Sequence, residues 1–182
     1  KSQELGVDLG GDKELIGRIV DRVKEMESRG FTFEAADASF ELLVHEEMSG
    51  KRPSFFTIDH WLTTVERSED QSILTKAEVK VTAMGKQISC SGTGNGPVNA
   101  FDNALRTGLK ALYPELEVLE LTDYKVRILD GATATGAITR VLLDATNGDR
   151  SWTTIGVSAN IIEASWDALE ESLIYGLLHA SA

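Results

Sequence analysis

Apolar side chains recur every three to four positions over the first fifty residues, a spacing that places them on one face of a helix. A first helix is predicted between an N-cap at Asp12 and Gly30, a residue type that suits the left-handed position after a helix end. A second helix is predicted over residues 33–50, with Phe40 and Leu43 on its apolar side. The chain is therefore expected to begin with two amphipathic helices.

The second predicted helix is rich in acidic residues, which raises the possibility of catalytic carboxylates. A solvent-facing side of the helix is the favoured interpretation, because an amphipathic helix places its charged residues opposite its apolar stripe. The segment 49–54 (SGKRPS) then breaks the helical pattern with glycine and proline, and it indicates a boundary. The acidic residues concerned are Glu34, Asp37, Glu41, Glu46 and Glu47.

Beyond this boundary the apolar period changes from helical spacing to two. Ala77, Val79 and Val81 alternate with charged residues, which is typical of a strand with one face on a core and the other in water. The second part of the chain is therefore predicted to contain a sheet.

An internal repeat relates the two halves of this second part. Residues 59–112 align with 123–176 without a gap at a shift of 64 positions, and each copy reads as three strands and a helix. The turns at 84–85 and 148–149 correspond, as hairpins between second and third strands would. The identical pairs are Asp59 and Asp123, Thr75 and Thr139, Thr82 and Thr146, Gly92 and Gly156, Ala100 and Ala164, Ala104 and Ala168, Leu105 and Leu169, and Leu109 and Leu173.

Each copy has a sheet with one apolar face and a helix with one apolar stripe, and neither copy buries both alone. The copies are therefore expected to pack as a pseudo-twofold pair. The predicted fold class is α+β, with a helical linker subdomain over residues 1–54 and a second domain over 55–182. This second domain consists of two βββα units at about 55–113 and 119–179.

Composition excludes several classes of partner. The chain has 182 residues and a formal net charge of -11, which repels nucleic-acid phosphates and anionic membrane surfaces. No apolar run approaches the length of about 20 residues that a membrane-spanning helix needs. We therefore expect a cytoplasmic globular protein that binds neither nucleic acid nor membranes.

The residues that usually carry metal or nucleophilic chemistry are sparse. Cys90 is the single cysteine and is expected to be a reduced, buried thiol. His45, His60 and His179 show none of the spacings that bring two metal ligands together. No serine or aspartate stands in a recognisable nucleophile-and-base pattern. The sequence predicts no catalytic residue, no metal site and no cofactor in this chain.

The glycine-rich turn, residues 92–97 (GTGNGP), leads directly into a predicted helix. A helix start leaves backbone N–H groups unpaired and stabilises a carboxylate or phosphate there. Pro97 suits the first turn of that helix, and Gly94 and Gly96 permit close approach of the backbone. The turn lacks the lysine of a P-loop and the spacing of a dinucleotide motif. A small carboxylate ligand and a purely structural turn both remain open.

Four segments together resemble the C-terminal part of citramalate synthases, in the isopropylmalate synthase and homocitrate synthase superfamily. The likeness covers nearly the whole chain, and the motifs occur in the same order as in the family. They are residues 30–44 (GFTFEAADASFELLV), 92–105 (GTGNGPVNAFDNAL), 122–131 (TDYKVRILDG) and 152–169 (WTTIGVSANIIEASWDAL).

The resemblance implies a helical linker followed by an allosteric regulatory domain that pairs in a homodimer and binds an end-product amino acid. It implies that the divalent metal and acetyl-CoA of the parent acyltransferase belong to a catalytic barrel absent from this sequence, so this chain alone is expected to be inactive. Isoleucine is the expected feedback inhibitor if the parent makes citramalate from pyruvate. Alternatives are a leucine-sensing isopropylmalate synthase domain, a structural dimerisation module without ligand, and a stand-alone enzyme.

The resemblance also implies an effector site near the helix starts of the two units, at the dimer interface. The second unit has Ala159, Asn160 and Ile161 where the first has Asn95, Gly96 and Pro97, so strict two-site symmetry is not expected. The implied effector-binding residues are Gly94, Asn95, Gly96, Pro97, Val98, Asn99, Ala100, Tyr124, Asn160, Ile161, Ile162 and Ala164.

Overall fold

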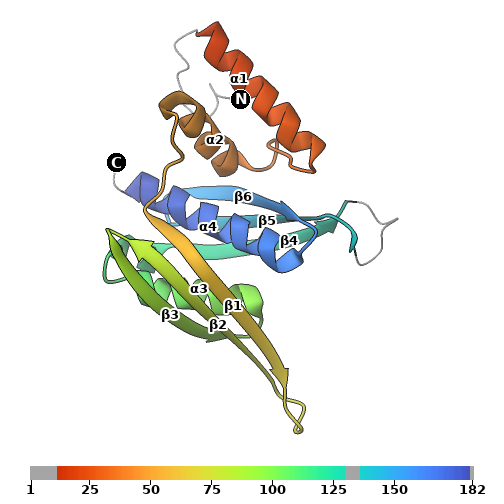
Figure 1. Cartoon of the computed structure of the whole chain (residues 1–182), viewed down its shortest axis with the longest axis vertical. Helices are drawn as coiled ribbons and strands as arrows, with labels where there is room; N and C mark the ends of the chain where they lie inside the picture. The colour runs from red at the N-terminus through yellow and green to blue at the C-terminus, as the bar shows by residue number, and fades with distance from the viewer. Residues whose placement is uncertain (1–11, 130–135, 181–182) are drawn as a thin grey trace.

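The computed structural model describes residues 12–129 and 136–180 (Figure 1). Parts of three sequence predictions lie outside these residues: the outer ends of the two predicted domains, the last two residues of the motif 122–131, and residues 130–135 of the second repeat copy. The division into domains at 54 and 55 stays a prediction.

Two helices, the helical pair, precede the first sheet: α1 (Lys13–Ser28) and α2 (Asp37–Ser49). The predicted N-cap is confirmed, because the Asp12 carboxylate accepts hydrogen bonds from the backbone N–H groups of Glu14 and Leu15. Gly30 follows the helix with a φ of 107°, so the predicted left-handed residue is also confirmed.

The second helix starts four residues later than predicted, at Asp37 instead of residue 33. Phe33 reaches the core of the helical pair from the preceding loop, where its ring lies 6.2 Å from the ring of Phe40. Phe33 is therefore buried, as its apolar side chain suggested, but it is buried by tertiary packing of a loop and not by its position on a helix.

The interpretation of the acidic residues of α2 as a solvent-facing side is wrong for Glu41. Its side chain is only 5% exposed, because α2 packs against β6 (Ser151–Ser158) and α4 (Ile161–Ala180) with this face. Glu34, in the loop before α2, is exposed as expected. One carboxylate of the group is therefore buried at a contact between distant parts of the chain.

Both predicted βββα units are present, which confirms the α+β fold class. In the first unit β1 (Phe56–Arg67), β2 (Ile73–Ala83) and β3 (Lys86–Gly94) form an antiparallel sheet in that order, followed by α3 (Pro97–Leu109). In the second unit β4 (Glu120–Ile128), β5 (Thr139–Thr146) and β6 pair in the same way before α4. A short 3-10 helix, Pro114–Val118, connects the units.

The repeat alignment is reproduced by the elements, because α3 starts at Pro97 and α4 starts at Ile161, 64 positions later. The predicted strand pattern is confirmed as well: Ala77, Val79 and Val81 on β2 are at most 1% exposed. These buried side chains face one core that both units share. Cys90 lies in it as a buried free thiol, as predicted.

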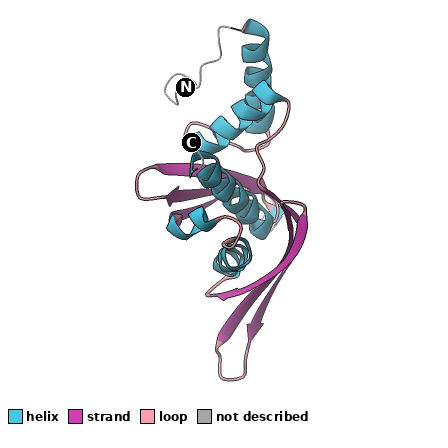
Figure 2. Ribbon diagram, turned by 90° about the vertical axis from the view of Figure 1, so that its left-hand side faces the viewer, coloured by secondary structure: helices cyan, strands magenta, loops and turns pink. Residues whose placement is uncertain are grey.

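The helical pair contacts the second unit, through α2 against β6 and α4. The β1–β2 hairpin extends in the opposite direction, away from the body of the molecule (Figures 1 and 2). The second unit therefore lies between the helical pair and the first unit, and α4 takes part in both contacts.

Candidate functional site

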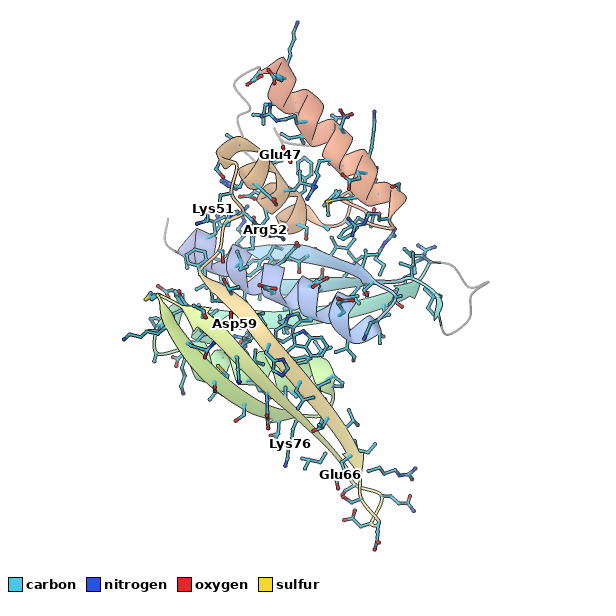
Figure 3. The ribbon with its side chains drawn as sticks, viewed as in Figure 1. Glu47, Lys51, Arg52, Asp59, Glu66 and Lys76 are labelled. Carbon is cyan, nitrogen blue, oxygen red and sulfur yellow. The ribbon has the colours of Figure 1, made fainter. Side chains whose placement is uncertain are left out.

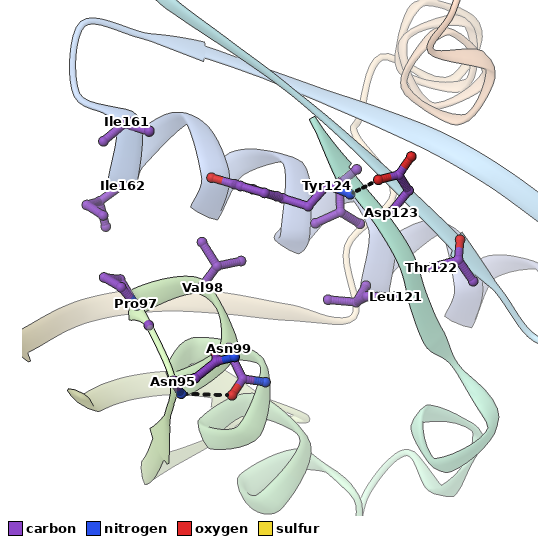
Figure 4. Close-up of a pocket in the computed structure, with 12 residues that line it drawn as sticks. Asn95, Pro97, Val98, Asn99, Leu121, Thr122, Asp123, Tyr124, Ile161 and Ile162 are labelled. Atoms are coloured by element: carbon purple, nitrogen blue, oxygen red, sulfur yellow. Dashed lines mark hydrogen bonds between the residues drawn. The ribbon is translucent and has the colours of Figure 1, made fainter. Parts of the chain in front are cut away.

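A cavity of about 650 Å³ lies where the starts of α3 and α4 meet the edge strand β4 (Figure 4). Its volume is in the range typical of small-molecule sites. Eight of the twelve predicted effector residues line it. These are Asn95, Gly96, Pro97, Val98, Asn99, Tyr124, Ile161 and Ile162.

The other four predicted residues support the walls from outside the cavity. Gly94 lies under α3, where a Cβ atom would come within 2.6 Å of the backbone nitrogen of Ala100. Ala100 and Ala164 are fully buried in the shared core. Asn160 uses its side-chain oxygen to cap α4, accepting from the backbone N–H of Ile162 at 2.9 Å.

Four lining residues were absent from the sequence prediction: Leu121, Thr122, Asp123 and Leu143. Three of them surround a β-bulge, since the pairing of β4 with β5 shifts register between Leu121 and Asp123. Such bulges are common beside functional sites because they redirect side chains and leave backbone groups unpaired. The identity of Asp123 with Asp59 in the repeat was a sequence signal for this strand, but it did not indicate the cavity.

The starts of the two helices differ in their hydrogen bonding. Asn160 caps α4, whereas α3 starts at Gly96 and Pro97 with no side-chain cap among the described residues. The first-turn N–H groups of α3, those of Val98 and Asn99, therefore carry the positive end of the helix dipole without a side-chain acceptor. The two helix starts therefore differ in their capping, and the expected lack of two-site symmetry in effector binding stays a prediction.

Tyr124 forms a wall of the cavity and connects β4 to α4. Its hydroxyl lies 2.6 Å from Oγ of Ser165. The Ser165 hydroxyl donates its hydrogen to the carbonyl oxygen of Ile161 at 2.6 Å, so the Tyr124 hydroxyl is the donor in the first bond. Tyr124 is 41% exposed, and in Figure 4 its ring extends from β4 towards Ile161 and Ile162.

The carboxylate of Asp123 points away from Ile161 and Ile162 in Figure 4, on the side opposite to the Tyr124 ring. Lys125 binds it at 2.7 Å, and the hydrogen bonds from Lys125 and from the backbone N–H of Tyr124 lower the pKa of Asp123. Asp123 is therefore a lining residue whose ionised carboxylate is paired on the side away from Ile161 and Ile162. The apolar lining residues are Pro97, Val98, Leu121, Leu143, Ile161 and Ile162.

Over the ranges 12–129 and 136–180, no three histidine, cysteine or acidic side chains are grouped closely enough to hold a metal ion. Within the same ranges, none of the helices is both long and apolar enough to cross a membrane.

The two βββα units around one core place the chain among α+β proteins with an internal duplication. The model of one family, the LeuA allosteric (dimerisation) domain, matches residues 34–177, and the chain belongs to this family. The resemblance drawn from the sequence motifs is thereby confirmed.

Relatives match along almost the whole chain. It is 51% identical over 180 residues to an (R)-citramalate synthase of Streptomyces coelicolor, covering 99% of this chain and 34% of that protein. A Synechocystis (R)-citramalate synthase is 44% identical, over 97% of this chain and 33% of that protein. A 2-isopropylmalate synthase of Aquifex aeolicus is 33% identical, over 94% of this chain and 30% of that protein. The chain thus spans about a third of the length of these relatives.

Proposed function

We propose that this chain is the regulatory part of a citramalate synthase and that its cavity binds a branched-chain amino acid, with isoleucine favoured, as a feedback inhibitor. The observation that carries the proposal is the uncapped start of α3 at the wall of a mainly apolar cavity. An amino acid combines an anionic group for the helix start with a side chain for apolar walls. The names of the relatives supply the class of parent enzyme.

In the proposed complex the effector carboxylate accepts hydrogen bonds from the N–H groups of Val98 and Asn99. Its ammonium group lies at the bulge of β4, where Thr122 is left out of the ladder and offers backbone carbonyl oxygen. Its branched side chain contacts Leu121 and Ile161. Each part of the ligand then meets a wall of matching chemistry.

The parent reaction under this proposal is the condensation of acetyl-CoA with pyruvate to citramalate by an acyltransferase. The metal and acetyl-CoA sites belong to a catalytic barrel outside this sequence, and the enzyme works in the cytoplasm. Two copies of the regulatory region form a homodimer, which the description of the family supports. Edge strand β4 has exposed apolar residues, among them Val126 and Ile128, which a second copy would bury.

Calorimetric titration of this chain with isoleucine, leucine and valine tests the proposal. We expect isoleucine to bind most tightly and isoleucinamide, which lacks the carboxylate, to bind at least about tenfold more weakly. Equal affinity for the amide would contradict the placement of the carboxylate at α3. Heat from none of the three amino acids would contradict effector binding and favour a structural dimerisation module, which sedimentation would show as a ligand-free dimer.

A leucine sensor is the second candidate, and the match to a 2-isopropylmalate synthase supports it. The two branched side chains differ in the position of one methyl group, a difference worth about 1–3 kcal/mol in a shaped pocket. Leucine binding more than about tenfold tighter than isoleucine would therefore replace the citramalate assignment with this alternative.

A further inference from the structure

Helix α4 extends from the cavity to the helical pair. Its first residues, Ile161 and Ile162, line the cavity, and Ser165 one turn later accepts the hydrogen bond from Tyr124 of β4. The helix has 20 residues and is about 30 Å long. A restraint applied at its start can therefore be transmitted to its far end by a rigid element.

The far end of α4 holds the buried carboxylate of Glu41 from α2. The Tyr175 hydroxyl donates to Oε2 of Glu41 at 2.8 Å, and Nε2 of His179 lies 2.8 Å from Oε1. The Arg150 guanidinium lies 3.1 Å from Nδ1 of His179. Because arginine only donates, Nδ1 is an acceptor and Nε2 carries the hydrogen that Glu41 receives. Glu41 is thus bound by residues from the second unit.

Two further side chains of α2 cover the open edge of the second sheet. Asp37 accepts the backbone N–H of Thr153 at 2.8 Å, and Ser39 accepts that of Ile155 at 3.0 Å. Ser39 also donates to Glu171 of α4. Since β6 is an edge strand, these bonds satisfy backbone groups that would otherwise be unpaired. The docking of α2 on the second unit therefore combines these polar contacts with the burial of Ala38 and Leu42 in the shared core.

The polar part of this contact, here called the joint, centres on the carboxylate of Glu41. A buried carboxylate that loses a partner is strongly destabilising, so the loss of one bond to Glu41 is expected to weaken the joint. Arg52, between the helical pair and α4 in Figure 3, adds an ion pair with Glu171.

We propose that α4 couples occupancy of the cavity to docking of the helical pair, with Glu41 as the positioning residue of the joint. A ligand held between α3, β4 and the first turn of α4 restrains α4, and this restraint stabilises the bonds of Tyr175 and His179 to Glu41. The coupling is reciprocal, so a loosened joint weakens ligand binding in turn. The inference rests on the proposed effector site, and the joint itself is testable without ligand.

Hydrogen exchange of the ligand-free chain tests the joint through Tyr175→Phe, which removes one donor to Glu41 and keeps the ring. We expect the amides of α2 to exchange about tenfold faster and those of α3 to be unchanged. Tyr113→Phe is the matched control, because it removes a hydroxyl that donates to the Phe55 carbonyl in the first unit. Unchanged α2 exchange in folded Tyr175→Phe protein would overturn the inference.

Saturating isoleucine tests the coupling in the same variants. We expect it to slow α2 exchange at least about fivefold in the unmodified chain and in Tyr113→Phe, but less than about twofold in Tyr175→Phe. Calorimetric binding without any slowing of α2 exchange would overturn the coupling alone. Absence of calorimetric binding in the unmodified chain would overturn the proposed effector site together with the coupling.

Discussion

Gly94 and Gly96 lie two residues apart in the glycine-rich turn and differ in what surrounds them. A Cβ atom on Gly94 would meet the backbone nitrogen of Ala100 at 2.6 Å, so this glycine permits the close packing of β3 and α3. A Cβ atom on Gly96 would have no heavy atom within 4 Å, and its φ of -172° is ordinary extended backbone. Gly96 lines the cavity and therefore has room for a side chain there.

Gly96→Val places a branched side chain at the cavity without backbone strain. We expect the Kd for isoleucine to rise about tenfold or more, because the new methyl groups obstruct approach to the start of α3. Thermal stability should change little. Gly17→Val in α1 is the control, since a Cβ atom there also has open space. Unchanged affinity in folded Gly96→Val protein would show that the turn only routes the chain.

At the scale of the elements, a glycine repeated in both units lets the third strand and the helix approach closely. A Cβ atom on Gly156 of β6 would lie 1.8 Å from the carbonyl oxygen of Ala164 in α4. A Cβ atom on its repeat partner, Gly92, would lie 2.5 Å from the backbone nitrogen of Ala104 in α3. The identities found in the repeat thus include glycines and alanines at which helix and sheet backbones approach closely.

Gly156→Ala should destabilise the chain by about 1–3 kcal/mol, because α4 must move away from β6 to accommodate the methyl group. Equilibrium unfolding in urea measures this loss. Gly17→Ala provides the opposite case, since alanine in a helix is favoured over glycine by up to about 1 kcal/mol. Equal stability of Gly156→Ala and the unmodified chain would contradict the close packing of α4 on β6.

At the scale of the whole molecule, carboxylates gather where the helical pair meets α4. Burial, followed by the negative charges of Glu163 and Glu171, raises the pKa of Asp167 to about 6. Burial and the charge of Asp167 raise the pKa of Glu170 to about 7. Arg52 opposes both shifts without cancelling them. The folded chain therefore binds protons here more tightly than the unfolded chain.

This difference makes stability depend on pH. A carboxyl group whose pKa is raised by folding stabilises the folded state fully when the pH is below its pKa in the unfolded chain, about 4.3 for glutamate. This stabilisation is lost as the pH rises towards the pKa of Glu170 in the folded chain, about 7. We expect Glu170→Gln to reduce the fall in unfolding free energy between pH 5 and about 7.5. Urea titrations at pH 5 and at about pH 7.5 measure the fall in unfolding free energy. Glu34→Gln, at an exposed position, is the control, and an identical fall in both variants would refute the assignment.

The amino-acid sequence by itself determined the two βββα units and the place where the helix of each unit starts. Periods of two and of 3.6 report which face of a local segment is buried, and the shift of 64 positions showed that the second unit repeats the first. The family resemblance, and not the periodicity, pointed to Tyr124 and to the two helix starts as effector-binding positions, and these residues line the cavity.

Tertiary structure alone decided which segments meet. Leu121 and Leu143 line the cavity because the bulged edge strand lies beside two helix starts from different units. Glu41 is buried because α2 docks on α4, whose partner residues lie more than 130 positions away in the sequence. Local periodicity cannot distinguish a carboxylate that faces water from one that faces a distant hydroxyl and imidazole, since both stand at the same helical spacing. The contact partner, and not the pattern, determines the role of such a residue.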